Sequence, residues 1–155
     1  MNNNIISQNF KYKGNVTIKA RQGSKEWVLY THHNAGGLPI VEFFNKCLIG
    51  TYDERLRPKY LAITDDNNVP ILSSFPISKL ETTLTRKIAY TFTVPVSSLG
   101  SGTITIDKLY LFCDLYNGTN NWSAQVKLDE LLTIEATSQD ALIIEWDLSI
   151  TSEEV

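Results

Sequence analysis

The feature that most constrains the fold of this chain is a regular alternation of apolar and polar residues with a period of two. In residues 88–96, large apolar side chains occupy every second position from Ile88 to Val96, with alanine, threonine and proline between them. Successive side chains of a strand point to opposite faces, so the pattern predicts a long strand with one buried face. Residues 141–151 repeat it, with the inward set Leu142, Ile144, Trp146, Leu148 and Ile150.

A third long strand is predicted at residues 103–112, where the alternation changes phase. Ile104 and Ile106 share one parity, whereas Leu109 and Leu111 share the other. A β-bulge near residues 107–108 would bring both pairs to the same face. Pro95 cannot donate to a ladder, so we expect the end of the 88–96 strand at a sheet edge or a bulge.

Shorter apolar runs separated by Gly, Asn, Asp and Ser clusters complete a strand-rich pattern. One segment has helical spacing: Pro39 suits a first helical position, and Gly50 suits a left-handed stop. We therefore predict a mainly β protein, a two-sheet antiparallel β-sandwich or jelly roll with one short helix at about residues 39–49. The shorter strands are expected at residues 15–20, 26–31, 59–64, 123–127 and 131–136.

The length of 155 residues fits one domain, for which we expect a core at residues 13–151. Residues 1–12 are predicted to form an extended N-terminal arm and residues 152–155 an acidic C-terminal tail. The formal net charge of -3 argues against a nucleic-acid partner. No apolar stretch approaches the ~20 residues that cross a bilayer, and the N-terminus lacks the basic region and long apolar run of a signal peptide. We therefore expect no membrane partner, and a protein that stays in the cytoplasm or in something assembled there.

Three features resemble metal sites, and each has a simpler structural explanation. His32 and His33 are adjacent on a predicted strand, so their rings should point apart and not share a metal ion. The run at residues 65–68, Asp-Asp-Asn-Asn, lacks the alternate spacing of a calcium loop and predicts a solvated hairpin turn. Cys47 and Cys113 are expected as buried thiols. No serine, histidine and carboxylate form a recognisable catalytic set, so we expect no enzyme, metal or cofactor.

The loop at residues 114–122 is the best candidate for binding, because it combines aromatic rings with amides and a carboxylate. Exposed rings can anchor a protein interface or stack on a sugar, whose hydroxyls the polar side chains would bind. Tyr116 and Trp122 could equally pack inward as the ends of strands. The sugar-binding alternative would use Asp114, Asn117, Asn121 and Trp122.

The order of several motifs resembles a family of small structural proteins in the virions of tailed bacteriophages, short-tailed or crAss-like. The likeness spans most of residues 25–151 and departs from the family at residues 65–68 and at Tyr110. It implies a tail, neck-ring or baseplate component in many copies around an axis, without enzyme activity. The motifs are Asn34-Ala35-Gly36-Gly37-Leu38, the helix ending at Gly50, residues 60–64, Leu84-Thr85-Arg86-Lys87, residues 102–106, residues 109–112, and Leu142-Ile143-Ile144-Glu145-Trp146.

The resemblance gives the leading functional hypothesis, a non-enzymatic phage protein that forms or bridges a symmetric ring. The expected partners are copies of itself and other virion proteins, and the expected location is the virion, assembled in the host cytoplasm. If the strand at 88–94 or that at 142–150 lies at a sheet edge, a neighbouring copy can pair with it. A carbohydrate-binding module and a small carboxylate hydrolase remain alternatives. The expected interface residues are Ile5, Ile6, Phe10, Tyr116 and Trp122.

Overall fold

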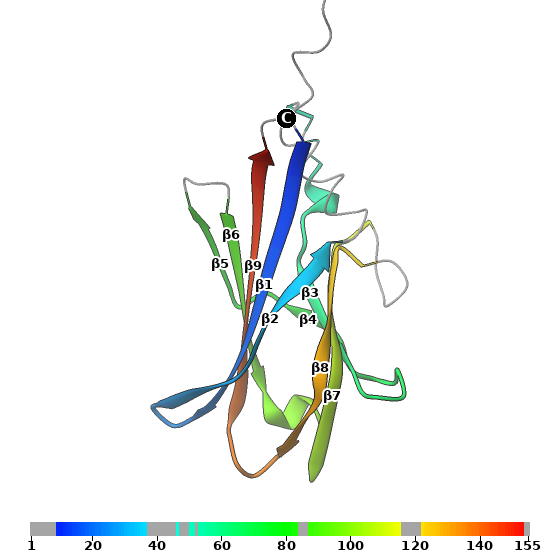
Figure 1. Ribbon diagram of the computed structural model, residues 1–155. Helices are drawn as coiled ribbons and strands as arrows, with labels where there is room; N and C mark the ends of the chain where they lie inside the picture. Colours follow the sequence, from blue (N-terminus) through cyan, green and yellow to red (C-terminus); the bar gives the residue numbers. More distant parts are fainter. Residues whose placement is uncertain are drawn as a thin grey trace, which may run out of the picture.

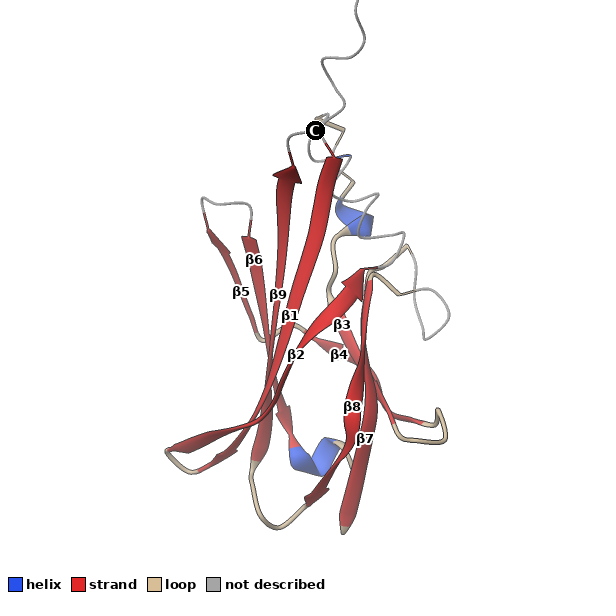
Figure 2. Cartoon of the chain, viewed as in Figure 1, coloured by secondary structure: helices blue, strands red, loops and turns tan. Residues whose placement is uncertain are grey.

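The computed structural model describes residues 9–36, 46, 50–51, 53–83, 87–115 and 122–153. Most of these residues lie in antiparallel strands, which form two facing layers (Figure 1, Figure 2). The mainly β sandwich expected from the alternation is therefore confirmed. The 3-10 turns η2 (Glu54–Leu56) and η3 (Val96–Ser98) are short and lie in connections between strands.

The first layer contains five strands, and the second contains four. In spatial order the first layer is β5 (Lys79–Thr83), β6 (Lys87–Pro95), β9 (Ala141–Glu153), β1 (Asn9–Gln22) and β2 (Lys25–Gly36). The second layer is β4 (Pro70–Pro76), β3 (Tyr60–Thr64), β7 (Thr103–Phe112) and β8 (Ala124–Glu135). The layers join where the last two residues of β2, Ala35 and Gly36, pair with the start of β8.

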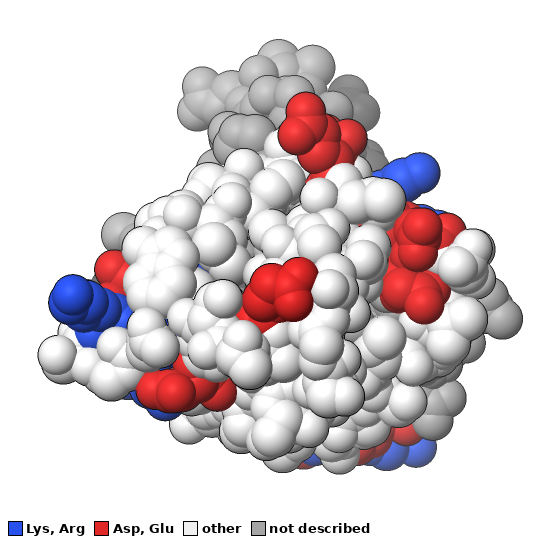
Figure 3. Space-filling view, turned by 90° about the horizontal axis from the view of Figure 1, so that it is seen from below, with Lys and Arg blue, Asp and Glu red and all other residues white. Residues whose placement is uncertain are grey.

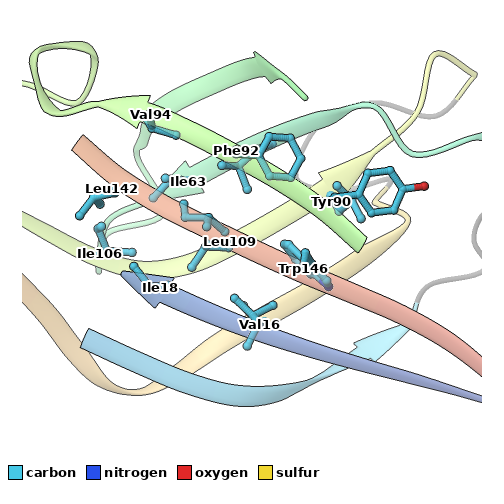
Figure 4. Close-up of a cluster of buried hydrophobic side chains, with 14 of the residues drawn as sticks. Val16, Ile18, Ile63, Tyr90, Phe92, Val94, Ile106, Leu109, Leu142 and Trp146 are labelled. Atoms are coloured by element: carbon cyan, nitrogen blue, oxygen red, sulfur yellow. The ribbon is translucent and has the colours of Figure 1, made fainter. Parts of the chain in front are cut away.

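The core lies between the layers and is built from the alternating residues of the long strands (Figure 4). On β9, Leu142, Ile144, Trp146 and Leu148 are all 0 % exposed, as the sequence predicts. On β6, the neighbouring strand of the same layer, the residues paired with them are Tyr90, Phe92 and Val94, which are also 0 % exposed. Each of these large side chains contributes about 1.5–3 kcal/mol of burial, so the two strands supply much of the stability of the fold.

The predicted irregularity in β7 is confirmed. Ile104, Ile106, Leu109 and Leu111 all belong to the one core, and the β7–β8 register shifts between Ile106 and Lys108. Ile106 pairs with Leu132 and Lys108 pairs with Lys127, so the extra residues of the bulge are contributed by β8, at positions 128–131. Residues 123–127 and 131–136 were expected to form separate strands, but they belong to one strand bent at this bulge, except for Ser123 and Ala136, which flank it.

Several strand boundaries differ from the prediction. β4 and β5 were not expected, because prolines bound β4 and neither strand has a strong apolar alternation. The strands predicted at 88–94 and 142–150 are not sheet edges: β9 lies between β1 and β6, and β6 is covered by β5 along residues 87–91. Pro95 lies beyond the β5 ladder, at an edge, as expected.

The predicted helix at 39–49 lies outside the described residues, except for Lys46, which is helical. Its expected stop is confirmed, since Gly50 has a φ of 80° and the Thr51 N–H donates to the Lys46 carbonyl oxygen at 2.9 Å. This is the hydrogen bond of a Schellman ending. Residues 9–12 of the expected arm form the start of β1 and pair with the end of β9, at residues 150–153.

Candidate interaction surface

The outer face of the second layer carries an aromatic cluster, formed by Tyr60, Tyr110, Phe112 and Trp122 around Ala62. Tyr60 pairs with Phe112, and Ala62 pairs with Tyr110, across the β3–β7 ladder. The residues between them, such as Leu61 and Leu111, face the core on the other side of the sheet. This part of the sheet is therefore apolar on both faces, whereas the outer face of a solvated antiparallel sheet is usually polar.

Tyr60 and Trp122 partly shield the other members of the aromatic cluster from solvent. Tyr110 is 5 % exposed and Phe112 is 4 % exposed, and the half-buried Tyr60 and Trp122 pack against them. The rings of Tyr60 and Phe112 stack at a centroid distance of 5.3 Å and an angle of 29°. Tyr60 and Trp122 are therefore the members of the cluster that keep the most exposed surface.

A charged rim borders the aromatic cluster at the Tyr60 end of β3. The Lys59 ammonium lies 2.7 Å from Asp114 Oδ2 and 3.5 Å from Glu54 Oε1, and Arg57 Nη2 lies 2.9 Å from the same Glu54 oxygen. The Lys59 backbone N–H donates to the Phe112 carbonyl oxygen at 2.9 Å, which fixes the rim to the end of the sheet. The rim therefore offers both signs of charge beside an apolar centre.

Hydrogen bonds within the rim shift the pKa values of its ionisable groups. The bond from Lys59, and then the bond from Tyr60, hold the pKa of Asp114 below its ordinary value. The bond to Asp114 raises the pKa of the Tyr60 hydroxyl, and the same carboxylate raises the pKa of Lys59. Asp114 is thus a fixed carboxylate that can accept hydrogen bonds. A lowered pKa is the opposite of what a general acid requires near neutral pH.

The predicted interface residues are distributed unevenly with respect to the aromatic cluster. Trp122 belongs to it, and Asp114 of the sugar-binding alternative lies in its rim. Phe10 lies in β1 and pairs with Ser152 of β9. The remaining candidates, Ile5, Ile6, Tyr116, Asn117 and Asn121, lie outside the described residues.

His32 and Cys113 are two further residues that the sequence singled out. His32 Nδ1 lies 3.3 Å from Asp129 Oδ2, and its ring lies 5.9 Å from that of Tyr30, while the side chain of His33 lies outside the described part. Within the described residues no three His, Cys, Asp or Glu side chains are grouped to hold a metal ion. Cys113 is buried, as predicted, and Cys47 lies outside the described residues.

Residues 65–68 form the expected hairpin turn, between β3 and β4. Asp65 Oδ1 accepts hydrogen bonds from the backbone N–H groups of Asn67 and Val69, both at 2.9 Å. A shallow hollow of about 240 Å³ lies beside the turn, where Asp66 meets the loop of Gly100 and Ser101. Because the Asp65 carboxylate holds the turn, the chemistry of this run is structural.

Sequence reasoning missed Tyr60, Tyr110 and Phe112, which form most of the aromatic cluster. The signal was present, since residues 60–63 and 109–112 are apolar at both parities. A strand with this pattern is covered on both faces. The pattern does not show that β3 pairs with β7, and this pairing is what brings the two apolar runs side by side.

Comparison with models of protein families, with curated proteins and with solved structures finds no match for this chain. Among the described residues, no helix is both long enough and apolar enough to span a bilayer.

Proposed function

We propose that this chain is a non-enzymatic structural protein of a phage particle, which forms or bridges a symmetric ring in the tail, neck or baseplate. The observation that carries the proposal is the aromatic cluster with its charged rim on the outer face of the second layer. The resemblance of the sequence motifs to phage structural proteins supplies the biological setting. The partners are other copies of the chain and further virion proteins.

The composition of the surface supports a protein interface. Interfaces typically have an aromatic and apolar centre surrounded by a polar rim, and most of the binding energy comes from a few Trp, Tyr and Arg residues. Here Tyr60 and Trp122 occupy the centre, while Lys59, Arg57 and Asp114 lie in the rim. Opposite charges in the rim orient a partner and exclude surfaces with the wrong pattern.

A carbohydrate-binding module is the second candidate, and one specific contact favours it. Asp114 is held as a carboxylate by Lys59 and Tyr60, close to the ring surface of the aromatic cluster. A ring that stacks on a sugar beside a fixed hydrogen-bond acceptor is a common way to recognise hydroxyl groups. Binding to a glycan array that Trp122→Ala abolishes would select this function over assembly.

Self-association of the purified chain tests the proposed function. We expect multi-angle light scattering to show assemblies and negative-stain imaging to show rings. Trp122→Ala should weaken the contact by about 2 kcal/mol, the cost of truncating an interface hot spot. Val69→Ala is the matched control, because Val69 is 53 % exposed but lies in the turn beyond the opposite end of β3.

Two results would contradict the proposal. One is a chain that stays monomeric at all concentrations, alone and with other particle proteins. The other is turnover on a panel of sugars or esters, which would favour the hydrolase.

Removing residues 1–6, which leaves β1 (Asn9–Gln22) intact, tests the expected contribution of Ile5 and Ile6. Flanking portal or tail genes would give independent support.

A further inference from the structure

The first layer ends in two strand edges, β2 and β5, with the order β5-β6-β9-β1-β2 (Figure 1). Within the described residues, β2 pairs with β8 only through Ala35 and Gly36, so most of its outer edge continues no ladder. β5 pairs with β6 on one side and ends the layer on the other. Such edges are templates for pairing with another chain unless they are blocked.

Each edge carries large apolar side chains that are exposed. On β2, Trp27 is 39 % exposed and Val28 is 58 % exposed, and every residue from Gln22 to Val28 is exposed. On β5, Leu80 is 38 % exposed. A protective edge usually carries charge or proline at such positions. At Trp27, Val28 and Leu80 the two edges therefore lack this protection, although charged residues flank these positions.

Trp27 and Leu80 belong to the same face of the first layer. Trp27 pairs with Ala20, and Leu80 pairs with Tyr90, and both of these partners point into the core. Side chains alternate along a strand, so Glu26 and Lys79, the residues just before them, belong to the outer face. Both Glu26 and Lys79 are exposed.

The directions of the strands decide how the two edges can meet. All four neighbouring pairs of the first layer are antiparallel, so β2 and β5 run in the same direction. When a second copy continues the sheet with its strands aligned, β2 of one copy therefore lies parallel to β5 of the next. Neighbouring residues in that arrangement point to the same face of the sheet.

One register of this contact between copies, called the joint below, places compatible side chains together on both faces of the sheet. With Trp27 beside Leu80 of the next copy, Glu26 stands beside Lys79. The apolar pair then lies on the core-side face, and the opposite charges lie on the outer face. Seen from the end that carries the β1–β2 hairpin, the surface is mostly uncharged, with scattered charges of both signs (Figure 3).

We propose that copies of this chain join head to tail by parallel pairing of residues 26–28 of β2 with residues 79–81 of β5 in the next copy. The contact is heterologous, so its repetition closes a ring when the rotation per copy divides a full turn. The inference rests on the proposed assembly function and identifies the second copy as the partner at these edges. It uses a surface distinct from the aromatic cluster, which stays available for a second contact with other copies or with further virion proteins.

Cysteine cross-linking tests the joint directly. Adjacent strands lie about 4.8 Å apart, within the reach of a disulfide between facing residues. We expect Trp27→Cys mixed with Leu80→Cys to give a disulfide-linked dimer under mild oxidation. Neither variant alone, nor the wild-type chain with its two native cysteines, should give that product. A dimer from either variant alone would indicate symmetric pairing of like edges and would overturn the proposal, as would no cross-link in the mixture.

Charge reversal provides an independent test. Glu26→Lys and Lys79→Glu should each weaken self-association about five- to tenfold, because each replaces an opposite-charge pair with a like-charge pair. The double variant should restore association to within about twofold of wild type. Circular dichroism checks that every variant is folded. A double variant that associates no better than the single variants would contradict the register.

The outcomes separate this joint from the proposed function. One outcome is that rings still form in both charge-reversal variants and that the mixture of Trp27→Cys and Leu80→Cys gives no cross-link. That outcome leaves the proposed structural role in place and overturns the β2–β5 contact. A chain that is monomeric in every sample overturns both. Rings that break up with the single variants and reform with the double variant support the joint and the function together.

Discussion

Replacing Trp146 by phenylalanine should leave the free energy of unfolding almost unchanged, although Trp146 is 0 % exposed. Trp146 lies on β9 between Val16 of β1 and Tyr90 of β6, in the centre of the first layer. Its indole Nε1–H is buried and has no hydrogen-bond acceptor among the described residues. The side chain therefore combines a large apolar contribution with a polar cost.

The two contributions nearly cancel in the Trp146→Phe variant. The smaller ring loses about 1–2 kcal/mol through reduced burial and the space left behind. Removing a buried donor without a partner raises stability by about 1–3 kcal/mol. We therefore expect the variant to unfold within about 1 kcal/mol of the wild type.

Urea unfolding followed by far-ultraviolet circular dichroism measures this difference, provided that the slope with urea is the same for each variant. Phe92→Leu is the control, because Phe92 is also 0 % exposed, pairs with Ile144 of β9 and carries no polar atom. That variant should lose about 1–2 kcal/mol. A Trp146→Phe loss above about 2 kcal/mol would refute the reasoning, since the indole N–H would then have to make a hydrogen bond in the folded chain.

Two further changes test the hairpin turn and the charged rim. Asp65→Ala should lower the free energy of unfolding by about 1–2 kcal/mol through the loss of two hydrogen bonds. Asp66 is the exposed neighbour, and Asp66→Ala should change the free energy of unfolding by less than about 0.5 kcal/mol. Equal losses in urea unfolding would contradict the role assigned to Asp65. The lowered pKa of Asp114, caused chiefly by Lys59, means that its stabilising effect is present above the ordinary value of 3.8 and is lost as the pH falls through the folded value. The melting temperatures of wild type and Asp114→Asn should therefore differ near neutral pH and converge in strong acid, and a difference that persisted there would argue against the Lys59 contact.

The sequence alone predicted the features that depend on local chemistry. The alternation in residues 88–96 and 141–151 identified the inward faces of β6 and β9, including Trp146. The phase change at residues 107–108 identified the irregularity of β7, and Gly50 identified the helix stop. In each case the signal lies within a few residues, because side-chain direction in a strand and left-handed backbone in a cap are local properties.

The tertiary structure decided which strands are edges and which faces meet. β4 and β5 lack a strong apolar pattern and are strands because β3 and β6 supply their ladder partners. The same long-range pairing brings Tyr60 beside Phe112 to make the aromatic cluster, and it leaves the outer edges of β2 and β5 at the ends of one layer. Ladder order depends on contacts between residues far apart in the chain, which a local period of two does not encode.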